Sequence, residues 1–131
     1  MHELRSSLRR FHDITKLEES ATALGGKPRH TLQFEYHGKI DMEHLETAAR
    51  KQRFRFKAEH RQHGTVVRIT EGTRRGVVPV TMVLDNYPIL AKAKGPTAFF
   101  SIQHSEPELR KTTRAKLVKL FRLMHTPRAK W

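Results

Sequence analysis

The sequence predicts an α+β domain with a single, mainly antiparallel sheet and helices packed on it. Three observations support this prediction: short segments alternate between apolar and polar residues, other segments have helical apolar spacing, and turn residues separate them. The predicted element order is α-β-α-β-β-β-β-α, because strands that follow one another closely tend to pair antiparallel. We assign residues 1–126 to this domain and residues 127–131 to a loose basic C-terminal tail.

The N-terminal segment is predicted to be helical. Its apolar residues recur at steps of three, four and six between Leu4 and Leu24, and Asp13 is positioned to restart the helix as a cap. Gly25-Gly26 is expected to end this helix, because glycine adopts the left-handed closing conformation at little cost.

A strand and a second helix follow. Residues 31–36 alternate, with Leu32, Phe34 and Tyr36 on one face, which is typical of a half-buried strand. After a turn at residues 37–39, Asp41 is predicted to cap a helix. The apolar face of that helix comprises Met42, Leu45, Ala48 and Ala49.

Four further strands are predicted, over residues 53–59, 65–70, 77–84 and 98–103. His63-Gly64 is a plausible hairpin turn between the first two. Pro79 suggests that the third strand lies at an edge or starts late, because proline cannot donate to a strand ladder. Residues 85–96 are predicted to form a loop.

A long final helix is predicted to open at Ser105 and end at Pro127. Ser105 and Glu108 have the spacing of a capping box, with Pro107 early in the first turn. The buried stripe of this helix is expected to comprise Leu109, Thr113, Leu117, Leu120 and Met124.

The composition excludes several classes of protein. With no cysteine, the chain can form no disulfide, thiolate metal site or cysteine nucleophile. Its first residues lack the apolar core of a signal peptide, and no segment approaches the length of a membrane span, so a cytoplasmic location without membrane partners is expected.

The charge balance is the strongest functional signal. Lysine and arginine number 26 against 13 acidic residues, which gives a net charge of +13 and favours a polyanionic partner. Nucleic acid is the first expectation. An acidic protein, a phosphorylated cofactor, or no specific anion are the alternatives.

Two segments concentrate this positive charge. The segment from Leu109 to Trp131 contains no acid and eight cations, and a helix face would present such cations at every turn, although they also suit a solvated helix C-terminus. A second row would lie on the outward face of a strand, where cations can follow a phosphate backbone or prevent edge-to-edge aggregation. The loop between Gly72 and Gly76 adds a third basic group. The candidate anion-binding residues are Arg53, Arg55, Lys57, Arg61, Arg74, Arg75, Arg110, Lys111, Arg114, Lys119 and Arg122.

Other chemistry has weaker support. His60 and His63 are separated by three positions, but no partner pair has ligand spacing, so no metal site is predicted. His104 at the end of the last strand, with Glu108 nearby, could act as a base near neutral pH. The alternative for Glu108 is its role in the capping box.

One family resemblance bears on His104. The run from Leu32 to Leu45, then Ala48 and the Arg53–Phe56 segment, resembles the strand-"G-x-L-D"-helix-strand opening of the condensation-domain and chloramphenicol-acetyltransferase superfamily. Phe99-Phe-Ser-Ile-Gln-His-Ser-Glu-Pro-Glu-Leu109 lies where that family carries H-H-x-x-x-D-G. The likeness covers residues 24–124, the N-terminal lobe of that family.

The resemblance implies an activity. His104 matches the catalytic histidine, which deprotonates the nucleophile that attacks a thioester, and Glu108 matches the largely structural aspartate. Gln103 replaces the first histidine and Leu109 the glycine, and the second lobe that completes the channel is absent from the chain. A single lobe would need a partner or a dimer to form that channel.

Two main hypotheses follow. The first is a non-enzymatic binding protein that holds a polyanion without a cofactor, with nucleic acid, either RNA or DNA, as the first candidate. The alternative is a lobe or partner subunit of an acyltransferase that uses coenzyme A or phosphopantetheine, with His104 as base. An interaction module for an acidic protein is the third hypothesis. Phe99 beside Phe100 suggests that both faces of the sheet are covered, one of them by a second subunit in a homodimer.

Overall fold

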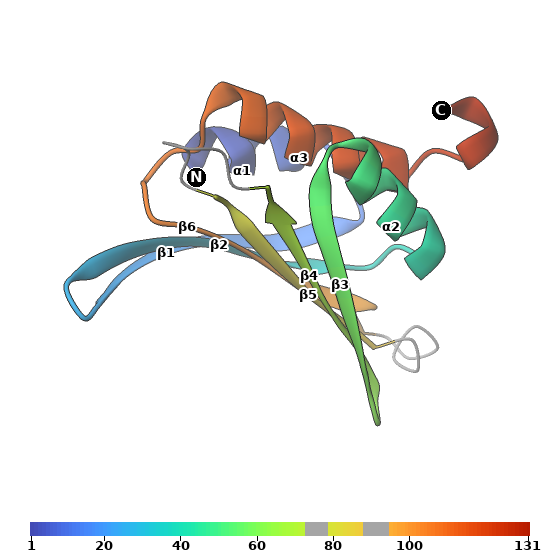
Figure 1. The fold of residues 1–131 in the computed structure, drawn as a ribbon, viewed down its shortest axis with the longest axis horizontal. Coiled ribbons are helices and arrows are strands. Elements are labelled where there is room, and N and C mark those ends of the chain that lie inside the picture. The colour runs from blue at the N-terminus through green and yellow to red at the C-terminus, as the bar shows by residue number, and fades with distance from the viewer. Residues whose placement is uncertain (73–78, 88–94) are drawn as a thin grey trace.

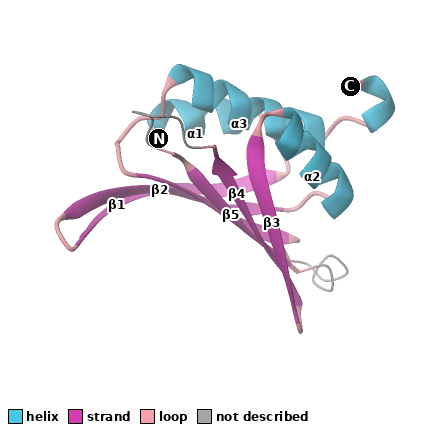
Figure 2. Ribbon diagram, viewed as in Figure 1, coloured by secondary structure: helices cyan, strands magenta, loops and turns pink. Residues whose placement is uncertain are grey.

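The computed structural model describes residues 1–72, 79–87 and 95–131, which form one sheet covered by helices on one face (Figure 1). Figure 2 shows the two layers, with the strands below and the helices above. The elements are α1 (His2–Leu8), β1 (Ile14–Leu24), β2 (Lys27–Tyr36), α2 (Met42–Lys51), β3 (Phe54–Arg61), β4 (Gly64–Glu71), β5 (Thr81–Asn86), β6 (Ala98–His104), α3 (Lys111–Met124) and a short 3-10 helix η2 (Arg128–Lys130).

The six strands have the order β1-β2-β6-β5-β4-β3, and every neighbouring pair is antiparallel. β6, the last strand in the chain, therefore lies between β2 and β5. The α+β class and the antiparallel sheet predicted from the sequence are confirmed. The observed order contains one more strand than predicted, because a hairpin precedes α2.

The core lies between the sheet and the helices. Alternate residues of β2, β4, β5 and β6 point to the helices and are buried. Phe34, Phe100 and Phe121 of α3 are mutually packed, with ring centroids 5.0 to 5.6 Å apart. α3 therefore anchors the middle of the helix layer on the centre of the sheet.

The prediction of a helix through residues 14–24 is wrong. Only His2–Leu8 is helical, and Ile14–Leu24 pairs with β2 as the first strand of a hairpin. Gly25 and Gly26 have φ of 60° and 77° and form the hairpin turn where a helix end was predicted. A bulge between Thr15 and Glu18 places Lys16 at a φ of 55°.

The prediction that the final helix opens at Ser105 is also wrong. α3 begins at Lys111, and Arg110 is its N-cap without a side-chain hydrogen bond. Instead of taking part in a capping box of α3, the Glu108 carboxylate accepts hydrogen bonds at the start of α1, from the amino group of Met1 at 3.0 Å and from the His2 N–H at 2.9 Å.

Other local predictions are confirmed. Asp41 is the N-cap of α2, and its side chain accepts a hydrogen bond from the His44 N–H at 3.1 Å. β3 and β4 form the hairpin expected around His63-Gly64. The predicted strand at residues 77–84 is observed as Thr81–Asn86, and residues 77–78 lie outside the described residues.

The C-terminal tail is not loose. The Trp131 indole donates a hydrogen bond to the Thr126 carbonyl oxygen at 3.0 Å and packs beside His44 of α2, with ring centroids 4.7 Å apart. Lys51 lies over the same indole ring at 5.4 Å. The tail therefore covers one end of the α2–α3 pair.

A small polar network joins the helix layer to the sheet. The hydroxyl of Tyr36 on β2 lies 3.2 Å from Nε2 of His125, just after α3, and the same nitrogen lies 3.2 Å from Asp13 Oδ2. Nδ1 of His125 lies 2.6 Å from the Phe121 carbonyl oxygen. Burial first, and the charge of Asp13 second, raise the pKa of Tyr36 well above the ordinary tyrosine value.

Candidate polyanion interface

α3 carries more positive charge than any other described helix. Its sequence KTTRAKLVKLFRLM contains five cations and no acid. Thr113, Leu117, Leu120 and Phe121 are buried, which turns the opposite side of the helix to solvent. α3 lies between α1 and α2 in the helix layer (Figure 1), so its outer side forms the centre of the solvent-exposed surface of that layer.

Three of the α3 cations are exposed and have no ion pair among the described residues: Lys111, Lys119 and Arg122. Their helical spacing places them on one side of the helix over about 16 Å, at 1.5 Å per residue. Double-stranded nucleic acid carries about one charge per 1.7 Å of its axis, so this line of cations can meet several phosphates at once. We call these three residues the α3 ridge.

Other candidate cations have acidic partners and contribute less free charge. Arg114 pairs with Glu3 of α1. Arg110 lies 3.6 Å from Glu71, which is buried and also accepts a hydrogen bond from Thr113 at 2.5 Å. Arg61 lies 3.7 Å from Glu59. These residues orient neighbouring elements, and the ion pairs reduce the positive charge that they offer to a ligand.

The row on β3 lies on the other side of the molecule from the α3 ridge. Arg55 and Lys57 point away from the helices, on the face of the sheet that we call the open face. Arg53 precedes the strand at the end of α2 with a φ of 63°. The structure therefore does not bring the two predicted basic segments together. Arg74 and Arg75 lie outside the described residues.

Sequence reasoning passed over two cations of the helix layer, Arg9 and Arg10, which are exposed just after α1. They flank the α3 ridge because α1 contacts α3, which no local pattern in the N-terminal segment indicates. Arg68 of β4 extends the β3 row, since it lies directly opposite Lys57 in the β3–β4 register.

The open face is mixed in charge. One row of neighbouring residues crosses all six strands in register: Lys57, Arg68, Val83, Ser101, Gln33 and Glu18. A second row comprises Glu59, Val66, Asp85, Phe99, Glu35 and Thr15. The cations of the open face are therefore largely offset by acids on the same face.

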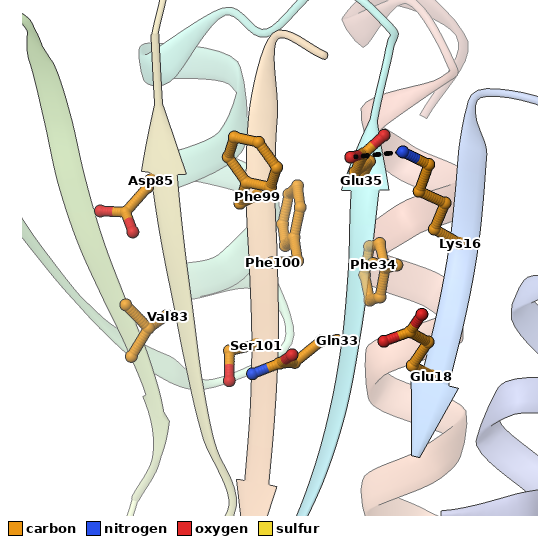
Figure 3. A pocket seen from close by; sticks show the side chains of 10 residues that line it. All are labelled: Lys16, Glu18, Gln33, Phe34, Glu35, Val83, Asp85, Phe99, Phe100 and Ser101. Atoms are coloured by element: carbon orange, nitrogen blue, oxygen red, sulfur yellow. Dashed lines mark hydrogen bonds and ion pairs between the residues drawn. The ribbon is translucent and has the colours of Figure 1, made fainter. Parts of the chain in front are cut away.

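A shallow depression of about 350 Å³ lies in the open face (Figure 3). Phe99 of β6 stands beside it and is 41% exposed, the one large apolar side chain so exposed among the described residues. Lys16 and Glu35 form an ion pair of 3.2 Å at one side. The depression therefore combines an aromatic surface with a largely acidic rim.

His104 and Glu108 differ greatly in exposure. His104 is 6% exposed, and its Nδ1 accepts a hydrogen bond from the Glu106 N–H at 3.1 Å. The Glu108 side chain is 48% exposed. Burial acts to raise the pKa of Glu108, but the hydrogen bonds and positive charges of the amino terminus and His2 outweigh it and lower that pKa.

Neither a metal cluster nor a membrane span is found in the described part of the chain. No three histidine or acidic side chains there are grouped to hold a metal ion. His60 instead has Nδ1 3.1 Å from the hydroxyl of Thr65 across the hairpin. No helix in residues 1–72, 79–87 and 95–131 has the length and apolar character to span a bilayer.

Comparison of the chain with protein-family models, with curated proteins and with solved structures finds no match.

Proposed function

We propose that this chain is a non-enzymatic binding protein that holds a polyanion, with nucleic acid as the first candidate, against the outer surface of its helix layer. The α3 ridge is the main contact. The observation that supports this proposal is the set of exposed cations Lys111, Lys119 and Arg122 on a helix without any acid.

The distribution of charge favours the helix layer over the sheet. On the open face, most of the charge of the cations Arg55, Lys57, Arg61, Arg68 and Lys16 is offset by the acids Glu18, Glu35, Glu59 and Asp85. On α3 and the adjoining end of α1, the one acid is Glu3, and Arg114 already pairs with it. A phosphate backbone is therefore attracted more strongly to α3 than to the open face.

Binding of this kind is expected to be independent of sequence. Lysine and arginine side chains on a helix exterior contact phosphates, and phosphate contacts carry no base information. The exposed aromatic residue Phe99, which could stack on a base, lies on the open face and not beside the α3 ridge. Affinity should therefore fall steeply with salt and differ little between sequences.

The test is a fluorescence titration of short labelled RNA and DNA at several salt concentrations, on protein first washed in high salt until its absorbance ratio shows no nucleic acid. The K111Q/K119Q/R122Q variant removes the α3 ridge. We expect its slope of log affinity against log salt to be shallower by about 2 to 3, at 0.7 to 0.9 per lost phosphate contact.

A matched control removes the same charge elsewhere. Lys27 and Arg29 at the start of β2, and Lys39 before α2, are exposed and have no ion pair among the described residues. K27Q/R29Q/K39Q should keep the slope of the unmodified protein. An equal decrease of the slope in both variants would mean that net charge alone attracts the nucleic acid. Absence of affinity at low salt, together with retention of an acidic protein, would favour an acidic protein partner instead.

A further inference from the structure

The open face is the part of the sheet that no other described element covers. α1, α2 and α3 all lie on the opposite face (Figures 1 and 2). The open face presents Phe99 at 41% exposure, and Val66 and Val83 are half-buried there. A sheet normally buries apolar residues of this kind against another layer.

Charge on the open face is separated by strand. Cations prevail at one end, with Arg55 and Lys57 on β3 and Arg68 on β4, and the one acid there among the described residues, Glu59 of β3, pairs with Arg61. Acids prevail at the other end, with Glu18 on β1 and Glu35 on β2, although Lys16 pairs with Glu35. The face is therefore positive at one edge and mainly negative at the other.

The positive edge lacks compensation within the chain. Lys57 lies directly opposite Arg68, and like charges in such cross-strand pairs are destabilising. No ion pair to Arg55, Lys57 or Arg68 occurs among the described residues. An external acidic surface that lies across β3 and β4 would offset this repulsion.

The strand order makes the face complementary to itself. A two-fold axis parallel to the strands, between the central strands β5 and β6, would place β3 of one copy over β1 of the other and β4 over β2. The row from Lys57 to Glu18 in one copy then lies over the same row of the other copy, which runs in the opposite direction. Lys57 therefore faces Glu18 of the other copy, and Arg68 faces β2 of the other copy, which carries Gln33 and Glu35. The two Phe99 side chains flank the axis.

The twist of the sheet permits the same arrangement. A twisted sheet is saddle-shaped, and β1 and β2 run strongly inclined to β3 in Figure 1. A rotation of the sheet by 180° about an axis along its strands exchanges its two edges and turns the sheet over. The rotated sheet has the same saddle shape as the original. Two such faces can therefore stack in parallel at about the 10 Å separation of packed sheets.

We propose that a second copy of this chain covers the open face about this two-fold axis, with the β3–β4 edge of each copy against the β1–β2 edge of the other. This proposal does not depend on nucleic-acid binding, because the α3 ridge lies on the opposite side of the molecule. In the dimer, both ridges remain exposed to solvent.

The test is a charge exchange measured by sedimentation velocity, on nucleic-acid-free protein over a range of concentrations. The unmodified protein is expected to dimerise. K57E/R68E makes both edges acidic, and E18K/E35K makes both edges basic, so each variant alone should be monomeric. An equimolar mixture of the two variants should sediment as a dimer.

Circular dichroism of each variant checks that the substitutions leave the fold intact. A monomeric unmodified protein at its highest soluble concentration would overturn the proposal. Persistence of the dimer in either variant would place the interface elsewhere, and failure of the mixed variants to pair would show that these edges do not face one another.

Discussion

Tyr36 shows how a single buried side chain links the stability of this protein to pH. The residue is 1% exposed and its hydroxyl faces His125. Gly38 closes over it, because a Cβ atom at position 38 would lie 2.6 Å from that hydroxyl. The hydroxyl is therefore held in its neutral form, away from water.

The raised pKa of Tyr36 predicts a loss of stability in alkali. The neutral form is favoured in the folded state, so its stabilisation is fully present below the unfolded tyrosine pKa of about 10 and is lost as the pH rises above it. Urea unfolding between pH 8 and 11 should show that the free energy of unfolding falls with pH more steeply in the unmodified protein than in Tyr36→Phe. The difference in slope should reach up to about 1.4 kcal/mol per pH unit.

The other tyrosine supplies the control for this measurement. Tyr87 is half-buried after β5, and Tyr87→Phe should keep the steep alkaline fall. Tyr36→Phe also loses the hydroxyl contact and should be less stable at pH 8, but that offset does not change the slope. Parallel curves for Tyr36→Phe and the unmodified protein would contradict the assignment.

At the scale of the element, α2 depends on its first residue. The Asp41 side chain is the acceptor for the His44 N–H, one of the donors that a helix start leaves without an intrahelical partner. Asp41→Ala should lower the free energy of unfolding by about 0.5 to 2 kcal/mol, whereas Asp41→Ser should retain most of it. Urea denaturation measures both, and an equal loss in the two variants would show that the cap is not responsible.

The hairpin of β1 and β2 shows where prediction of elements fails. Asp41 could be recognised because a cap is a local signal. β1, in contrast, is exposed on both faces from Glu18 to Ala23. Its sequence therefore lacks the alternation of apolar and polar residues by which a strand is recognised. Leu17 and Ala21 then match helical spacing by coincidence, and Gly25-Gly26 suits a helix end as well as a hairpin turn.

The basic surface was predictable as a set of residues but not as a geometry. The absence of acids in α3 is visible in the sequence, and three of its five cations, Lys111, Lys119 and Arg122, are exposed. The partners of Arg110 and Arg114 are Glu71 and Glu3, which are distant along the chain. The separation of Lys57 from α3 likewise depends on which face of the sheet the helices cover.

For the whole molecule, the net charge of +13 is itself a determinant of stability. Self-repulsion disfavours the compact state, and salt screens it over a Debye length of about 10 Å at 0.1 M. Raising sodium chloride from about 0.05 to about 0.5 M should therefore raise the urea midpoint while it weakens binding of nucleic acid. A lower midpoint in high salt would mean that ion pairs such as Arg114–Glu3 outweigh the repulsion.

The central place of β6 has a consequence for how the chain folds. β6 pairs with β2 on one side and with β5 on the other, and α3 follows it directly. During synthesis, the β1–β2 hairpin and the β3–β4–β5 meander leave the ribosome before β6. Until β6 pairs with them, β2 and β5 each have an unpaired edge. Only the last quarter of the chain joins them, and such long-range pairing is slow. The newly made chain therefore passes through a state in which two strand edges are open to other molecules, and the speed with which β6 inserts limits how long it is exposed to aggregation.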